Sequence, residues 1–251
     1  MNWRDYWNQD TPIYASERHK LLHYHRLAGD IAALVPAPDA AVLDHGSGEA
    51  LSADRVARAA ARLYLLDAAP LVRDRLRQRF AGEPRITVIA PEELGSLPDG
   101  SLDLVVANSL LQYLSLEETR ELLRLWRAKL SARGRLVLAD VIPHGVSPVT
   151  DARALLDFAW RGGFLLAALR GLARTALSDY RALRDELGLA QYDEEELIAL
   201  LRDEGYAAER LPRNLGHNQA RMAFLARPDR DEDHAPAEAE EVTGPEEAAR
   251  S

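Results

Sequence analysis

The sequence predicts an α/β protein with a doubly wound, mostly parallel sheet that ends in an antiparallel hairpin. Five short apolar runs alternate with helical patterns between about residues 40 and 142, which is typical of strands buried between two layers of helices. A glycine-containing turn follows the first run and an acidic residue ends the second, an order found in nucleotide-binding βαβ units. Two further apolar runs, separated by a short polar loop, complete the pattern as a hairpin.

The predicted elements follow one another along the chain. The five parallel strands are expected at residues 40–43, 63–66, 85–90, 102–107 and 135–142, the last entered through Gly134. Right-handed crossovers through the intervening helices place such strands side by side in one sheet. Helical patterns fall at residues 16–34, 52–62, 69–80, 116–130, 150–189 and 193–204, and the hairpin strands at 206–211 and 221–226.

The composition indicates a foldable chain without thiol chemistry. Of its 251 residues, 47% are hydrophobic and none is cysteine. This excludes disulfides, thiolate metal sites and cysteine nucleophiles, and it suits a reducing compartment. The first residues do not resemble a signal peptide, and no apolar run reaches the roughly 18 residues of a membrane span. We therefore expect a soluble cytoplasmic protein.

Negative charge is concentrated at the C-terminus. Residues 228–251 hold nine acidic and two basic residues, so they carry −7 of the net charge of −9 and leave −2 for the rest. A nearly neutral body argues against a nucleic-acid partner, which usually meets a basic face. The acidic stretch is poor in large apolar side chains and is predicted to be disordered. The expected organisation is a helical cap at 1–37, a main domain at 38–227 with a helical lid at 150–190, and this tail at 228–251.

The turn after the first strand carries the strongest functional signal. In the run Val42–Ala50, Gly46 and Gly48 allow a sharp turn and a close approach of the backbone to a ligand. The amides at the start of the following helix point toward such a ligand. Asp67 ends the second strand, where a carboxylate accepts hydrogen bonds from ribose hydroxyls. A glycine pair alone is more often a structural turn, but strand, turn, helix, strand and acid in this order predict nucleotide-type binding.

Two residues at this turn distinguish between classes of nucleotide. A dinucleotide site has a third glycine for close helix packing, and here that position is Leu51. Asp44, just before the turn, repels a pyrophosphate but suits a ligand with a positive amino group. S-adenosylmethionine carries an ammonium and a sulfonium group and no phosphate, so the turn favours it over a dinucleotide.

Five stretches resemble motifs of the class I S-adenosylmethionine-dependent methyltransferases. Val42–Ala50 resembles the first motif of that family, and Asp67 resembles its ribose-binding acid. Similar stretches lie at residues 97–105, 108–114 and 133–140, and the likeness covers roughly residues 38–227. The resemblance implies a seven-stranded Rossmann-like methyltransferase fold, S-adenosyl-L-methionine as the cofactor and methyl transfer as the activity.

The same resemblance implies a set of cofactor contacts, with two departures from the family pattern. Ala50 stands where the family has a third glycine. Glu92 or Glu93 stands where an acid often contacts the adenine amino group, and Glu92 is the preferred choice. The predicted cofactor-binding residues are Asp44, Gly46, Ser47, Gly48, Asp67, Ala68, Glu92, Asn108 and Ser109.

Histidine and other polar residues are predicted at the edge of the sheet where an acceptor meets the cofactor. A base of near-neutral pKa suits removal of a proton from an accepting hydroxyl. His217 in the hairpin loop is the first candidate base, His144 the second and His19 the third, and Asp140 is a further catalytic candidate. No metal site is predicted, because the N-terminal histidines lack a spaced carboxylate. The predicted acceptor-binding residues are Tyr14, His19, Gln112, Tyr113, Asn214 and Asn218.

The helical insertion leaves two interpretations open. Its apolar residues, among them Phe158, Trp160 and Phe164, are interleaved with arginines. It is either an amphipathic lid whose apolar side closes the pocket, or a basic amphipathic surface that meets a membrane or takes a lipid-like acceptor. In both cases Gly162 and Gly163 predict a hinge or kink between two helices.

The predicted function is transfer of a methyl group from S-adenosylmethionine to oxygen, nitrogen or carbon of a small-molecule or lipophilic acceptor. One alternative is a nucleotide-dependent oxidoreductase, which Leu51 and Asp44 disfavour. The other is a non-catalytic, S-adenosylmethionine-binding regulatory subunit, which has no need for histidine and amides at the rim of a pocket. The expected partner is the acceptor, and under the second interpretation of the insertion a membrane surface as well, so the expected location is cytoplasmic or, under that interpretation, membrane-peripheral.

Overall fold

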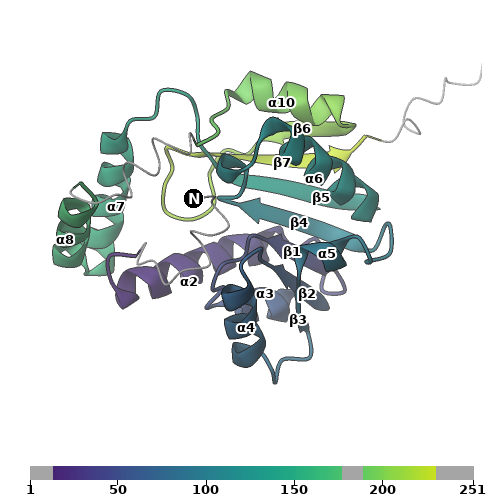
Figure 1. Cartoon of the computed structure of the whole chain (residues 1–251), viewed down its shortest axis with the longest axis horizontal. Helices are drawn as coiled ribbons and strands as arrows, with labels where there is room; N and C mark the ends of the chain where they lie inside the picture. The colour runs from purple at the N-terminus through teal and green to yellow at the C-terminus, as the bar shows by residue number, and fades with distance from the viewer. Residues whose placement is uncertain (1–13, 177–188, 230–251) are drawn as a thin grey trace, which may run out of the picture.

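A seven-stranded sheet with helices on both faces forms the centre of the molecule (Figure 1). The computed structural model describes residues 14–176 and 189–229. The strands are β1 (Ala41–His45), β2 (Arg62–Leu66), β3 (Ile86–Ile89), β4 (Leu102–Asn108), β5 (Leu130–Val141), β6 (Tyr206–Arg210) and β7 (Met222–Pro228). They lie in the order β3-β2-β1-β4-β5-β7-β6; β1 to β5 are parallel, and β7 is antiparallel to both β5 and β6. The predicted doubly wound sheet with a terminal antiparallel hairpin is confirmed.

The helices begin close to the positions that the sequence predicts, because capping residues mark them. Ser16 accepts a hydrogen bond from the His19 amide at 3.1 Å and caps the first turn of α2. Ser115 and Glu118 form a reciprocal capping box at the start of α6. The helices are α2 (Glu17–Leu34), α3 (Ala53–Ala59), α4 (Pro70–Arg79), α5 (Pro91–Leu94), α6 (Leu116–Lys129), α7 (Pro148–Gly162), α8 (Leu165–Ala176) and α10 (Glu194–Asp203), with a 3-10 turn η1 (Leu111–Tyr113).

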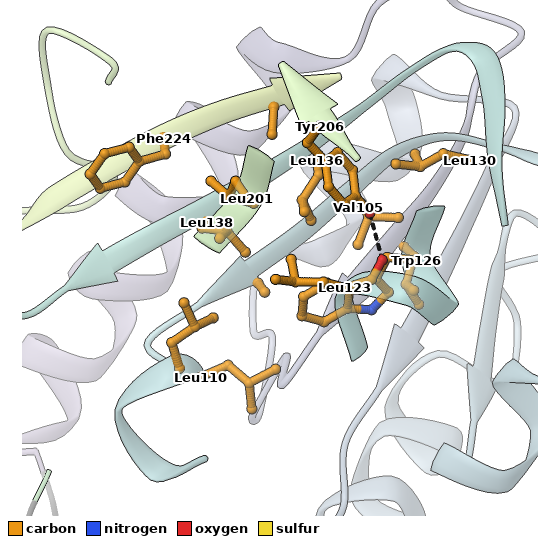
Figure 2. Close-up of a cluster of buried hydrophobic side chains, with 14 of the residues drawn as sticks. Val105, Leu110, Leu123, Trp126, Leu130, Leu136, Leu138, Leu201, Tyr206 and Phe224 are labelled. Carbon is orange, nitrogen blue, oxygen red and sulfur yellow. Dashed lines mark hydrogen bonds between the residues drawn. The ribbon is translucent and has the colours of Figure 1, made fainter. Parts of the chain in front are cut away.

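Alternate side chains of the strands belong to two separate cores. On β1, Val42 packs into a core with α2, α3 and α4, whereas Leu43 belongs to the core formed with α5, α6 and α10. Figure 2 shows the second core, where the Tyr206 hydroxyl donates a hydrogen bond to the Leu123 carbonyl oxygen at 2.7 Å. Because a buried tyrosine hydroxyl needs such a partner, this contact fixes β6 against α6. The sheet is therefore anchored on both faces, and its carboxyl edge is a rigid support for loops.

β5 starts earlier than the sequence predicts. The prediction has Gly134 leading into the strand, but β5 begins at Leu130, directly after α6, and contains Gly134. Its register against β4 shifts between Leu102 and Leu104, and a Cβ on Gly134 would lie 2.9 Å from the Leu102 carbonyl oxygen. Gly134 is therefore required by a close backbone approach within the strand, and not by a turn before it.

The insertion after β5 consists of two helices, which we call the α7–α8 arm (residues 148–176). Gly163 has φ +71° and ends α7 in the left-handed conformation, so the predicted hinge is a turn between the helices. The two helices pack through Ala159, Phe164 and Ala168, and Figure 1 shows them at the N-terminal end of α2.

Three predicted segments lie outside the described residues: residues 1–13 of the predicted cap, 177–188 of the predicted lid and 230–251 of the predicted tail. Among the described helices, none has the length and apolar character of a membrane span.

Candidate active site

A continuous cavity of about 840 Å³ opens at the carboxyl ends of the parallel strands. It lies where the strand order reverses between β1 and β4, which is where open α/β sheets bind ligands. Its wall has two parts, which we name by their residues. The glycine-turn half contains Gly46, Ser47, Gly48, Asp67, Ala68 and Glu92, and the histidine half contains Tyr14, His19, His23, Leu155, His217 and Asn218.

The glycine turn is held against α2 by a tyrosine. Gly46 and Gly48 have φ of +79° and +56°, the left-handed region that glycine adopts without strain. The Tyr24 hydroxyl accepts a hydrogen bond from the Glu49 amide at 2.9 Å, and it lies 2.7 Å from where a Cβ on Gly48 would be. Because no side chain fits there, glycine at 48 is required both by conformation and by this contact. The third-glycine position, Ala50, adopts φ +40°.

Asp67 links the end of β2 to the glycine turn. Its Oδ2 accepts a hydrogen bond from the Gly48 amide at 3.0 Å, and its Oδ1 accepts one from the Ala69 amide at 2.9 Å. Burial raises the pKa of this carboxyl, while these two amides act in the opposite direction. Each carboxylate oxygen has a further lone pair, so the side chain can accept two hydroxyls from the cavity while it holds the turn.

Asp44 lies behind the cavity wall rather than in it. It precedes His45, which is part of the wall, and its side chain is 9% exposed. Burial, and then the neighbouring charge of Asp67, raises the pKa of Asp44 to about 7. Two carboxyls at one end of the cavity form a region of negative potential when ionised, which suits a cationic ligand and opposes a phosphate.

Binding of S-adenosylhomocysteine, which carries an ammonium group, is expected to depend on pH through Asp44. With a pKa of about 7, this carboxyl is mostly protonated at pH 6 and mostly ionised at pH 8. The ammonium favours the ionised form, so the affinity should rise about tenfold from pH 6 to pH 8. Calorimetric titration at both pH values measures this, and Asp44→Asn should bind weakly with little pH dependence. Equal wild-type affinity at both pH values would refute the role of Asp44.

The structure separates the two glutamates considered for the adenine contact. The Glu93 side chain accepts a hydrogen bond from the Ala90 amide at 2.6 Å and so caps α5. Glu92 is exposed and is part of the cavity wall. Glu92 is therefore the glutamate that is available to a ligand.

A strained polar chain joins the ends of β4 and β5 on the far side of the cavity. Ser109 and Asp140 have φ of +54° and +57°, which is unusual for residues with a side chain and occurs where function requires it. The Ser109 hydroxyl donates to the Asp140 carboxylate at 2.6 Å, and Asn108 donates its amide to the Ser109 oxygen at 3.0 Å. Burial raises the pKa of Asp140, partly offset by the charge of Arg221. All three residues line the cavity.

The loop between β6 and β7 is tied to this chain and to the α7–α8 arm. The Asn214 side chain accepts a hydrogen bond from the Asp140 amide at 2.9 Å and donates to the Asn218 carbonyl oxygen. The Asn218 amide group donates to Asp151 of α7 at 2.9 Å, and Arg221 forms two hydrogen bonds with the same carboxylate. These contacts join the loop, the arm and the end of β5.

Aromatic and imidazole rings surround the histidine half. His217 stacks on Phe158 with ring centroids 4.5 Å apart, and His19 stacks on Phe164 at 4.9 Å. Edge contacts join His217 to His19 and to His23 at 6.2 and 6.0 Å. Burial lowers the pKa of His19 and His217 to about 4 and that of His23 to about 3. All three imidazoles are neutral at pH 7, so this half of the cavity is largely uncharged.

Most of the predicted site residues meet at this cavity. Asn214 supports the wall through Asp140, and Asp44 lies behind it. His144 is not at the cavity: its side chain is 52% exposed and lies 3.3 Å from Glu196. Other residues of the wall were not assigned a role from the sequence, and the helical spacing of His19 and His23 was a usable signal for one of them. Examples are His23, Tyr24, Asp151 and Leu155.

The residues present fit S-adenosylmethionine. Asp67 has acceptors for two hydroxyls, and the paired carboxyls suit an ammonium group. Two buried side-chain oxygens of the wall, Ser47 Oγ and Asn108 Oδ1, have no hydrogen-bond partner among the described residues, as expected for groups that await a polar ligand. The ribose, amino acid and adenine parts would then lie near Asp67, the glycine turn and Glu92.

Comparisons with known proteins agree with this site. Residues 43–138 match the family model described as a methyltransferase domain. No curated protein matches the sequence. Magnesium protoporphyrin IX methyltransferase from Synechocystis PCC 6803 with bound S-adenosylhomocysteine is 19% identical, with 90% of this chain and 93% of that chain covered and a TM-score of 0.55. The mitomycin 7-O-methyltransferase structure is 18% identical, with 90% and 61% covered and a TM-score of 0.60.

Residues 43–138 match a methyltransferase domain, and the whole described fold is shared with solved S-adenosylmethionine-dependent methyltransferases. The matched domain and the residues of the glycine-turn half assign methyl transfer as the activity and S-adenosylmethionine as the cofactor. The matched segment ends at residue 138, so it contains the glycine turn but neither the α7–α8 arm nor the β6–β7 loop. All of the residues that define the histidine half therefore lie outside the matched segment.

Proposed function

We propose that this methyltransferase acts on a small, largely apolar acceptor that binds in the histidine half of the cavity. The observation that carries the proposal is the continuity of this half with the glycine-turn half in one cavity of about 840 Å³. Pockets for a single drug-sized ligand have volumes of about 300–1,000 Å³, so this cavity has room for the cofactor and a compact acceptor.

The lining of the histidine half favours a flat acceptor without net charge. Stacked rings, such as His217 on Phe158, present apolar faces. The three imidazoles are neutral at pH 7, and Asp151 is already paired with Arg221 at 2.6 Å. Desolvating a charged acceptor here would be costly, because none of the described residues that define the histidine half carries an unpaired charge at pH 7. A phenol or a similar ring hydroxyl matches this environment.

His217 is the side chain that we assign to removal of the acceptor proton. It is neutral at pH 7 and lies in the same wall as Asp140 and Asn218, so its ring can accept a proton from a hydroxyl, although burial makes it a weaker base than the histidine of near-neutral pKa expected from the sequence. Asp140 is held by Ser109 and Asn214 and forms a fixed part of the wall around the acceptor, while the hydroxyl donates its one proton to His217. Bound S-adenosylmethionine supplies the activated methyl group; the protein holds the acceptor in line with it and excludes water.

The named activities of two similar structures support a small-molecule acceptor. By name, they act on magnesium protoporphyrin IX and on mitomycin, the latter at an oxygen. A third structure, 15% identical with a TM-score of 0.57, is a complex with the Haloferax volcanii Trm112 methyltransferase activator; 92% of this chain and 99% of that chain are covered. An activating protein partner is therefore a competing expectation for how the enzyme is assembled, and that name does not specify an acceptor.

Transfer of a labelled methyl group tests the proposal. The purified enzyme is incubated with methyl-labelled S-adenosylmethionine and, separately, with phenol, 1-naphthol, a fused three-ring phenol, a peptide digest or transfer RNA. We expect label in the phenols, increasing with ring area, because more rings bury more apolar surface. Label confined to peptide or transfer RNA would overturn the acceptor class. Binding of S-adenosylhomocysteine without label in any acceptor would favour the regulatory alternative.

A further inference from the structure

The outer surface of the α7–α8 arm has large apolar side chains that nothing covers among the described residues. Trp160 is 73% exposed, Leu166 70% and Leu169 47%. Trp160 and Leu166 lie close to the same turn at Gly163, one at the end of α7 and one at the start of α8. Single exposed leucines are ordinary, but a tryptophan and two leucines on one short arm mark an interaction surface.

The exposed residues of α8 form a single helical face. Leu166, Leu169, Arg170, Ala173 and Arg174 are all exposed, and their spacing of three and four residues places them on one side of the helix. The opposite side is buried through Ala168, against α7 and Phe164. α8 is thus amphipathic in an unusual sense: its outward face combines apolar side chains with arginines. On such a face the apolar side chains can enter the interface of a lipid bilayer while the adjacent arginines meet its headgroups.

The charge of the arm points to an anionic surface. Residues 148–176 contain four arginines and two aspartates in a chain of net charge −9. Both aspartates are engaged, Asp151 by Arg221 and Asp157 by Arg161. Arg153, Arg170 and Arg174 are exposed, and no ion pair within residues 14–176 and 189–229 compensates them. Arginines beside exposed tryptophan and leucine match anionic headgroups over acyl chains.

The inner side of the same arm forms part of the acceptor site. Leu155 of α7 lies in the cavity wall, and Phe158 stacks on His217. One arm therefore has an outward face suited to lipid and an inward face over the histidine half. From this juxtaposition we propose that the α7–α8 arm binds the surface of an anionic bilayer and that the acceptor is a lipophilic molecule dissolved in that bilayer. The second part of this inference rests on the proposed function; membrane binding itself does not.

Vesicle co-sedimentation tests whether the α7–α8 arm binds an anionic bilayer. The full chain is mixed with vesicles of phosphatidylcholine alone or with 30% phosphatidylglycerol, and the partition coefficient is measured in about 0.1 M salt. We expect binding to the anionic vesicles, at least tenfold weaker binding to the neutral ones, and release at high salt. The variant Arg170→Gln/Arg174→Gln should lower the coefficient by roughly thirtyfold, since each arginine near an anionic surface is worth about fivefold. Trp160→Ser/Leu166→Gln should abolish binding.

The controls separate this proposal from its competitors. Leu116→Gln/Arg77→Gln changes one exposed leucine and one exposed arginine away from the arm and should pellet like the wild type. All variants should bind S-adenosylhomocysteine with unchanged affinity. This result would show that they are folded and that the cofactor site does not depend on the outer face of the arm. No pelleting with anionic vesicles, or a wild-type dimer that the arm variants dissociate, would overturn membrane binding. Vesicle binding without methylation of any vesicle-dissolved naphthol would retain the membrane surface and refute only the acceptor assignment.

Discussion

Replacing Asp67 with alanine is expected to weaken S-adenosylhomocysteine binding by about 100-fold. The carboxylate has a free lone pair on each oxygen for the two ribose hydroxyls, and charge-assisted hydrogen bonds are each worth about 1.5–3 kcal/mol. Two such bonds correspond to at least about 3 kcal/mol, or roughly two orders of magnitude in Kd. The variant also loses the acceptor for the Gly48 amide, which loosens the glycine turn. Calorimetric titration measures the change directly.

A control substitution at a second aspartate distinguishes the loss of a direct contact at Asp67 from the loss of a negative charge in general. Asp74 lies on α4, a short distance along the chain, and its side chain is 63% exposed beside Arg77. Asp74→Ala removes the same charge but should leave the Kd within about twofold, because exposed ion pairs contribute little. If both variants bind alike, the ribose site is not at Asp67.

Replacing His217 with phenylalanine is expected to lower kcat by about a hundredfold or more, which is the usual contribution of a general base. Phenylalanine keeps a ring that can stack on Phe158 but has no nitrogen to accept a proton. KM for the naphthol acceptor should change little, because the stacking surface remains. Steady-state kinetics with the acceptor that the methyl-transfer panel identifies measure both constants.

The pH profile gives a second readout of His217. Its pKa is lowered to about 4, chiefly by burial, so the base is unprotonated and active above this value and protonated and inactive below it. The wild-type kcat/KM should therefore be flat with respect to this group from pH 6 to 8 and fall below about pH 5. The acid limb should be absent in His217→Phe. His144→Phe, at a site away from the cavity, should retain full kcat; a loss there equal to that of His217→Phe would contradict our assignment.

Much of the fold follows from local sequence patterns. Apolar runs such as Ala40–Leu43 have partners on both faces of the sheet, and strands buried on both faces read as continuously apolar. Helix starts are encoded by caps such as Ser16 and Ser115. The start of β5 was missed because Gly134 indicates a turn in isolation, whereas its true role depends on the Leu102 carbonyl oxygen, which is distant in sequence.

The site was less predictable in its acceptor half. The glycine turn and Asp67 are contiguous with strands, so their spacing along the chain determines their position in space. Tyr24, Asp151 and Leu155 reach the cavity only because α2 and α7 pack over the sheet edge, and no spacing within the sequence encodes that packing. The position predicted for His144 was wrong for the same reason: the residue follows β5, but its side chain lies beside Glu196 of α10.

A structure of the complex with S-adenosylhomocysteine tests the central claim, that one cavity holds cofactor and acceptor in adjoining halves. The account predicts the ribose hydroxyls on Asp67, the adenine near Glu92 and the sulfur directed toward His217 and Asp140. A product molecule lying in the histidine half, with the glycine turn empty, would contradict it.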